Sequence, residues 1–329
     1  FFMDQHYLLL QISDQLLHIH QYNKLNTSLF FPQQKISVEL EEKETQQIVM
    51  CSKICQLYSK YLQALHKSGL DFVNQANYHF NDLEKLNAKV LFMNNIENEN
   101  STQFIVLEVK EYLVVNIYHY LPDIDRILQQ QTQIYQKFTF QTDPFIKSMN
   151  ILEQIQHLLL NYSNRQIFFT GFGYGASIAS YCTHFLALLN PQLKAKLKCI
   201  AFSPIPCFTF KLSNLLNDII TTILVNDAQM SRLSKVAFDV LNLRIEKIKN
   251  QKKLEKNLVE IKLENICSED LLLASAMPKA QQFFVGGQVL WFEFDLRQLL
   301  VSQVSCVGFC EVLLRSREKM GQQDYWDAT

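Results

Sequence analysis

Hydrophobic and polar positions follow two different periods along this chain. Through the first 95 residues, apolar side chains recur three and four positions apart, most clearly at residues 7–20 and 45–66 and less clearly at 70–86. This spacing places the apolar side chains on one face of a helix. We therefore predict that residues 1–95 form a helical N-terminal region packed on the core.

Beyond residue 95, short runs rich in β-branched and aromatic residues alternate with helical patterns. Residues 103–109 and 112–118 are two such runs, and because only Lys110-Glu111 separates them they predict a β-hairpin. Later strands are predicted at residues 166–170, 198–202, 219–225, 288–294 and 311–315, and helices at 145–160, 176–189 and 235–263. This alternation predicts an α/β domain over residues 96–329, with a central, mostly parallel sheet flanked by helices.

The composition is that of a globular protein and argues against several kinds of partner. Hydrophobic residues make up 48% of the chain and charged residues 19%, and the formal net charge is −1, so no overall field attracts nucleic acid. The longest stretch without charge, residues 166–193, is interrupted by Asn190-Pro191 and other polar positions. We therefore expect no transmembrane segment and no nucleic-acid partner.

The eight cysteines contain no Cys-x-x-Cys pair, so neither a zinc ribbon nor a dithiol redox site is indicated. We expect buried free thiols, with no metal and no cofactor. Reduced cysteines and the lack of a signal-peptide pattern favour an intracellular protein, in the cytoplasm or in an organelle-associated assembly. A mitochondrial location stays open.

A glycine-rich turn between a predicted strand and a predicted helix is the most informative segment. Residues 170–176 read Thr-Gly-Phe-Gly-Tyr-Gly-Ala, with glycine at 171, 173 and 175. A strand, a tight turn and a helix in this order form the nucleophile elbow, Gly-x-Ser-x-Gly, of α/β-hydrolases. Glycine flanks the nucleophile because only a missing side chain lets the new helix lie close to its neighbours. Here Gly173 has the central position, so there is no hydroxyl to attack an ester.

Three other segments strengthen the resemblance, which is to class 3 lipases and especially to the diacylglycerol-lipase-like members. Residues 113–120 (Leu-Val-Val-Asn-Ile-Tyr-His-Tyr) resemble the strand that ends in Arg-Gly-Thr or Arg-Gly-Ser in the family. Residues 200–204 (Ile-Ala-Phe-Ser-Pro) resemble the end of the strand after the elbow helix. Residues 223–234 resemble the strand that leads to the triad acid, although Ser231 replaces the usual proline. The resemblance implies an α/β-hydrolase-like fold over about residues 100–329, with the helical region as an extension.

The resemblance also assigns the catalytic positions, and two of the three lack the required group. Gly173 stands at the nucleophile and Gln322 at the base, while Asp227 matches the acid. All eight histidines lie at or before His184, so no histidine follows Asp227, where the family has its base. We therefore expect a pseudoenzyme with no intact catalytic set.

The oxyanion hole is altered in the same way. Tyr120 stands where the family has its Arg-Gly-Thr element, and Tyr174 supplies one backbone amide to this degenerate oxyanion region. Gly171 and Gly175 are the elbow glycines. Ser177 and Cys207 are two candidates for a displaced nucleophile, but neither has an evident base near it in sequence.

Three functional interpretations follow. The leading one is a non-catalytic structural or protein-binding subunit of a larger assembly, with a bound lipid in the old active site as a variant. A nucleotide-binding module is the second, because Gly171-x-Gly173-x-x-Ala176 fits the loose dinucleotide fingerprint. The next strand, however, ends in Phe202-Ser203 without the acidic residue that the fingerprint requires. A residual ester hydrolase is the third.

Overall fold

The computed structural model describes residues 36–37, 40–65, 86–94, 102–119, 131–135, 138–225, 231, 283–295 and 298–304. The chain divides into two compact units, and all the elements below lie in the unit Ser37–Cys306, apart from Ile36 in the first strand. The predicted helices at 7–20, 70–86 and 235–263 and the predicted strand at 311–315 fall outside the described residues. No described helix is both long and apolar enough to cross a bilayer.

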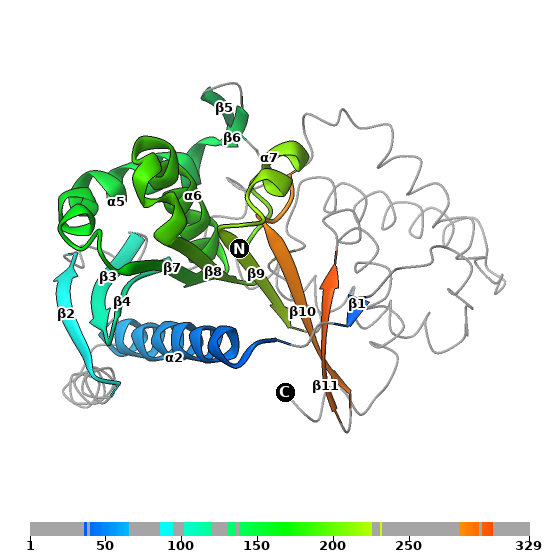
Figure 1. Cartoon of the computed structure of the whole chain (residues 1–329). Helices are drawn as coiled ribbons and strands as arrows, with labels where there is room; N and C mark the ends of the chain where they lie inside the picture. Colours follow the sequence, from blue (N-terminus) through cyan, green and yellow to red (C-terminus); the bar gives the residue numbers. More distant parts are fainter. Residues whose placement is uncertain are drawn as a thin grey trace, which may run out of the picture. The chain divides into compact units, whose positions relative to one another are not determined.

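A mixed, mainly parallel sheet forms the centre of this unit (Figure 1). Its nine described strands have the order β1-β11-β10-β9-β8-β7-β4-β3-β2. β4, β7, β8, β9 and β10 pair in parallel, and the antiparallel pairs β2–β3, β3–β4 and β10–β11 complete the sheet. The strands are β1 (Ile36–Ser37), β2 (Ala88–Met93), β3 (Thr102–Val109), β4 (Tyr112–His119), β7 (Gln166–Phe172), β8 (Leu197–Phe202), β9 (Ile220–Val225), β10 (Gln288–Asp295) and β11 (Gln298–Val304). The predicted mostly parallel sheet is confirmed.

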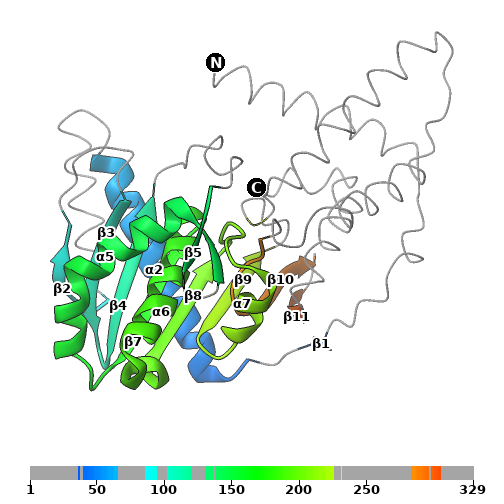
Figure 2. The same cartoon turned by 90° about the horizontal axis from the view of Figure 1, so that it is seen from above.

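Helices cover both faces of the sheet (Figures 1 and 2). α5 (Thr142–Asn161) and α6 (Tyr174–Leu189) lie on one face, where they share a hydrophobic core with the inward side chains of β4, β7 and β8. α2 (Glu42–Leu65) packs on the opposite face through an apolar stripe that includes Ile48, Ile54, Tyr58 and Leu62. The sheet is therefore the middle layer of three, and its central strands are buried on both sides.

α6 is the most enclosed helix of the described chain. Every residue from Tyr174 to Ala187 is buried, which matches a sequence that is apolar or small all round rather than along one stripe. The helix ends at Leu189 because Asn190-Pro191 follow, and a short 3-10 helix (Pro191–Lys196) leads into β8. This buried helix fixes the turn at its own N-terminus.

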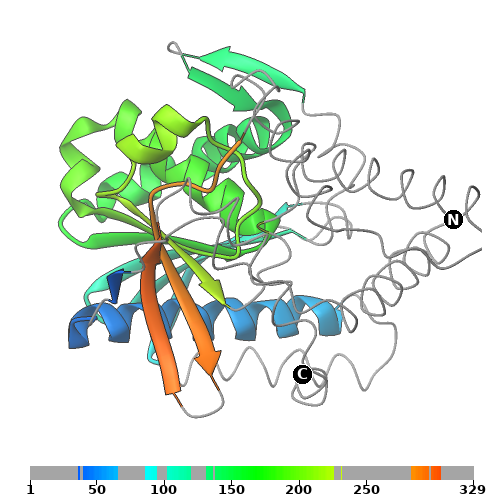
Figure 3. The same cartoon turned by 90° about the vertical axis from the view of Figure 1, so that its right-hand side faces the viewer.

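Several described elements differ from the sequence predictions. β2 is a strand within the region predicted to be helical, because a short apolar run can fit either structure. The two-stranded sheet of β5 (Thr132–Tyr135) and β6 (Phe138–Gln141) lies beyond α5 and α6, away from the central sheet (Figure 3). β11 and the short helix α7 (Phe210–Leu215) were also not predicted.

Candidate functional site

The glycine turn joins β7 to α6 at the carboxyl edge of the parallel strands. β7 ends at Phe172, Gly173 is the N-cap, and α6 begins at Tyr174. Gly173 has φ 57° and ψ −121°, a positive φ that glycine tolerates and other residues rarely adopt. Its N–H donates to the carbonyl of Phe202 at the end of β8, at 2.9 Å. The turn is thus a tight strand-to-helix junction, held in a conformation that favours glycine.

The two flanking glycines let α6 approach β4. A Cβ atom built on Gly171 would lie 2.6 Å from the carbonyl oxygen of Ile117, and one on Gly175 would lie 2.4 Å from the same atom. Both distances are far below van der Waals contact, and the obstacle is backbone, which cannot rotate away. The glycine spacing therefore has a direct steric cause.

A polar cluster surrounds the first residue of α6. The hydroxyl of Tyr174 and the ammonium of Lys147 both donate to the carboxylate of Asp143, the latter at 2.7 Å. Lys147 also lies 5.0 Å from the centre of the Tyr174 ring. The ring of His119, at the end of β4, lies 5.1 Å from that of Tyr174. These contacts join α5, α6 and β4 beside the elbow.

The charges of this cluster are compensated within it. Burial disfavours the carboxylate, but the hydrogen bonds from Lys147 and Tyr174 outweigh it and hold the pKa of Asp143 below its usual value. Burial, with the nearby ammonium of Lys147, lowers the pKa of His119 to about 4. Asp143 is therefore charged and His119 neutral at pH 7, and the ion pair of Asp143 with Lys147 lies beside Tyr174.

The two candidates for a displaced nucleophile are both engaged in structural contacts. Ser177 Oγ donates to the carbonyl of Ile205 at 2.9 Å and accepts from the Ile205 N–H at the same distance. Cys207 is almost fully buried, and burial raises the pKa of its thiol. Neither side chain is therefore presented to a substrate.

His184 lies inside the aromatic packing on the outer side of α6. Its ring centre is 5.2 Å from that of Phe185 and 5.7 Å from that of Phe140. Burial lowers its pKa to about 4, and its Nε2 atom has no hydrogen-bond partner. These surroundings are those of a neutral core histidine.

The described residues include only part of the predicted site. The structure brings Gly171, Gly173, Tyr174 and Gly175 into one turn, while Tyr120, Asp227 and Gln322 lie outside the described residues. Within the described chain, no group of three or more histidine, cysteine, aspartate or glutamate side chains could hold a metal ion.

The sequence prediction did not include Asp143 and Lys147. Their i, i+4 spacing at the start of a predicted helix marks them as an ion pair. Nothing in that spacing shows that the pair contacts Tyr174, which lies on another helix.

Comparisons with known proteins agree with this geometry. The model of the family Lipase (class 3) matches residues 100–230. A search of curated proteins finds no match. Among solved structures, the fungal lipase of a lipase–inhibitor complex has a TM-score of 0.52 at 10% sequence identity, over 81% of this chain and 87% of that one. A second fungal lipase has a TM-score of 0.51 at 8% identity, over 82% and 90%.

The Rhizomucor miehei lipase in complex with its propeptide has a TM-score of 0.49 at 9% identity, over 86% of this chain and 81% of that one. At such identities the structural likeness concerns the fold. Together with the family match, the likeness to the two structures with TM-scores of 0.52 and 0.51 confirms the resemblance predicted from the sequence. The chain is a class 3 lipase-like α/β-hydrolase in fold.

Proposed function

We propose that this class 3 lipase-like α/β-hydrolase has lost ester hydrolysis and serves as a protein-binding or structural subunit of a larger assembly. The observation that carries the proposal is Gly173, a residue without a side chain at the point of the turn where the family resemblance requires the nucleophile. The absence of any histidine after His184 in the sequence supports it, because the triad base is missing as well.

The loss of two triad members removes most of the means of catalysis. A nucleophile needs a base within hydrogen-bond reach and an acid that orients the base. Removal of the serine or the histidine from such a triad lowers kcat by about 10⁶-fold. The two candidates for a displaced nucleophile are both buried: Ser177 is hydrogen-bonded, and burial raises the pKa of the Cys207 thiol, which is therefore protonated. Backbone donors alone would leave only a small part of the rate.

A binding role accounts for a scaffold that is retained without its nucleophile. Function resides in sites carried by a fold, and a stable sheet with helices can present a surface after catalysis is lost. Seven large apolar side chains of the described chain are exposed, and Ile134 in the β5–β6 hairpin (79%) and Phe172 at the end of β7 (61%) are the most exposed of them. Five described cysteines are free thiols, which favours an intracellular, reducing compartment for the assembly.

Hydrolysis of a short-chain p-nitrophenyl ester by the native chain and by Gly173→Ser tests the loss of catalysis. We expect no turnover above the uncatalysed reaction from either protein, because the variant regains a hydroxyl but no base to activate it. Gly173→Ala is the matched control, since it adds a Cβ atom in the same backbone conformation without a hydroxyl. Turnover by Gly173→Ser that Gly173→Ala lacks would overturn the account of the missing base.

A residual ester hydrolase is the second candidate, and one contact favours it. Thr102 Oγ1 lies 3.1 Å from His119 Nδ1, across the antiparallel pair β3–β4. A neutral imidazole beside a hydroxyl is the arrangement of a nucleophile and its base. A pKa of about 4, however, makes His119 a weak base at pH 7. Turnover by the native chain that disappears in Thr102→Val would establish this second candidate in place of the first.

A further inference from the structure

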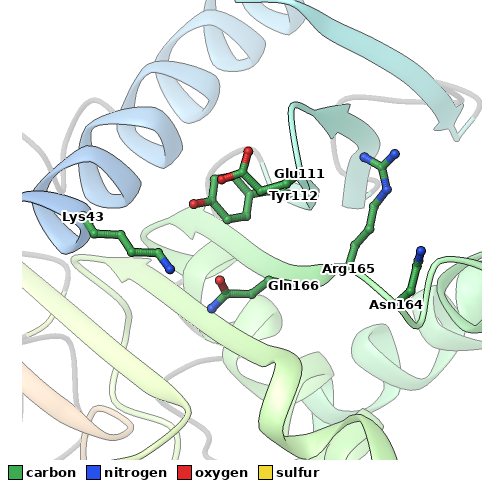
Figure 4. A pocket seen from close by; sticks show the side chains of 6 residues that line it. All are labelled: Lys43, Glu111, Tyr112, Asn164, Arg165 and Gln166. Atoms are coloured by element: carbon green, nitrogen blue, oxygen red, sulfur yellow. The ribbon is translucent and has the colours of Figure 1, made fainter.

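A pocket of about 430 Å³ at the start of β4 and β7 is balanced in charge (Figure 4). Arg165 Nη2, on its wall, lies 2.6 Å from Glu108 Oε1, and the lining contains both Lys43 and Glu111. The side-chain amides that line it offer acceptors as well as donors. The pocket therefore selects neither an anion nor a cation, and no partner follows from it.

The small sheet of β5 and β6 has a free outer edge. Phe140 of β6 pairs with Gln133 of β5 on one side and bridges to Phe208 on the other, and Phe208 bridges to Phe284. β5 is therefore the last strand of this ladder, and no described strand pairs with its far side. The hairpin stands clear of the central sheet (Figure 3).

The register of the hairpin decides which backbone groups of β5 point outward. The N–H of Thr142 donates to the carbonyl of Gln131 at 2.8 Å, so Gln131 belongs to a hydrogen-bonded pair. Along an antiparallel pair, residues that bond to the partner strand alternate with residues that face away from it. Gln133 therefore bonds to β6, and the N–H and C=O groups of Thr132 and Ile134 point away from it. Within the described chain, neither Thr132 nor Ile134 makes a backbone hydrogen bond outside the β5–β6 pair.

β5 lacks the features that commonly protect an exposed strand edge from pairing. Such edges carry a lysine, a proline or a bulge. β2, at one end of the central sheet, has both Lys89 and a bulge between Val90 and Phe92. β5 reads Thr-Gln-Ile-Tyr, with no charge, no proline and no bulge against β6, and its Ile134 is the most exposed large apolar side chain of the described chain. The outer edge of β5 is thus suited to pairing with another strand.

We infer that β5 is a docking edge, to which a partner protein adds an extended, uncharged segment as a further strand. Only an extended backbone matches the alternating donors and acceptors of Thr132 and Ile134. The segment carries apolar or β-branched residues beside Ile134, because cross-strand pairs of such side chains stabilise a sheet, and β5 has no charge to pair with a charged residue. The inference rests on the proposed function and names the surface and the kind of partner.

The edge is held in place before docking, and its size favours a partner protein over a second copy. Tyr135 of β5 lies 5.7 Å from Phe145 and 5.8 Å from Phe185 between ring centres, so little ordering is required on binding. β5 has four residues, and two such strands paired alone would bury far less than the roughly 1,000 Å² of a stable interface. A segment of a partner that also contacts the chain elsewhere in an assembly is free of that limit.

Hydrogen exchange resolved to single residues tests the inference on the assembly from a gently prepared extract and on the purified chain. The amides of Thr132 and Ile134 should exchange at least tenfold more slowly in the assembly, whereas that of Gln133, bonded to β6, should be protected in both samples. Equal exchange of Thr132 and Ile134 in the two samples would overturn the inference and leave the subunit role to another surface. Protection of the two amides in the purified chain alone would assign the edge to a second copy and overturn docking of a partner. Migration as a free monomer in the extract would overturn the proposed function and this inference together.

A charge placed on the edge gives a second test. Ile134→Lys should lower the fraction of the chain found in the assembly at least tenfold, and it should leave the fold intact because the side chain faces solvent. Leu215→Lys is the matched control, since Leu215 is an exposed apolar residue (59%) at the end of α7, outside the hairpin. It should leave that fraction unchanged within twofold. Equal retention of the two variants in the assembly would contradict docking at β5.

Discussion

Gly173 holds a backbone conformation that any side chain would make costly. Its φ of 57° with ψ of −121° lies outside the regions open to L-residues, and glycine adopts it without a steric penalty. In an active enzyme of this kind the nucleophile accepts such strain because the turn must expose it. If catalysis is lost, as proposed, glycine holds the same turn without that strain. A serine-to-glycine exchange at this position would then favour the fold at the expense of catalysis.

Replacement of Gly173 by alanine should lower the free energy of unfolding by about 1–2 kcal/mol, because the new Cβ atom strains the backbone. Replacement of Gly175 by alanine should cost about 3 kcal/mol or more, since its Cβ atom would lie 2.4 Å from the carbonyl oxygen of Ile117 and force α6 away from β4. Urea unfolding of the two variants measures both effects. Equal stability of Gly173→Ala and the native chain would contradict the strain argument.

At the scale of whole elements, an aromatic cluster joins α6 to the β5–β6 hairpin and to the segment after β8. Phe140 of the hairpin bridges to Phe208, and Tyr181 of α6 lies 4.7 Å from Phe208 between ring centres. The Tyr181 hydroxyl also donates to the carbonyl of Cys207. His184 lies among these rings as a neutral imidazole, so the packing of three elements depends on its protonation state.

This dependence predicts a loss of stability in acid. His184 has a pKa of about 4 in the fold, below the value of about 6.5 for an unperturbed histidine, so the unfolded chain binds the proton more readily. The stabilising contribution is complete above pH 6.5 and is lost as the pH falls toward 4. Relative to His184→Leu, the native chain should lose about 3 kcal/mol of unfolding free energy over that range.

Urea unfolding at several pH values between 4 and 7 measures this difference. Subtracting the unfolding free energies of His184→Leu from those of the native chain at each pH isolates the contribution of His184. His119, whose pKa is also lowered, is present in both proteins, so its contribution cancels. His157→Gln is the control, since it removes an exposed histidine of α5 that lies outside the aromatic packing around His184. Parallel curves for the native chain and His184→Leu would show that the imidazole is hydrated in the fold.

For the molecule as a whole, most strands of the central sheet could be predicted from the sequence, but fewer of the residues around the glycine turn could be. β3, β4, β7, β8, β9 and β10 begin and end within one or two residues of the predicted bounds, because turn residues such as Lys110-Glu111 and Ser203-Pro204 limit their apolar runs. The β5–β6 hairpin was not predicted because its strands have only four residues each and mix polar with apolar side chains, with Ile134 turned to solvent.

Side chains that meet only in the folded chain could not be predicted in the same way. Asp143 reaches Tyr174 because α5 and α6 pack side by side on the sheet, and Lys43 reaches the start of β7 because α2 crosses the opposite face. The spacing of glycines at 171, 173 and 175, by contrast, identified the turn, because that requirement is local to the backbone.

The proposed assembly concerns the whole molecule, and the native size of the protein tests it. In a gently prepared cell extract we expect this chain to migrate far above its own 38.5 kDa, with a fixed set of companions identified by mass spectrometry. The purified chain run alone is the control, because it separates self-association from binding of other proteins. Migration as a free monomer in the extract would contradict the structural-subunit proposal. Retention of the fold would then be attributed to a small molecule bound beside the glycine turn. Analysis of the lipids that co-purify with the protein would test for that molecule.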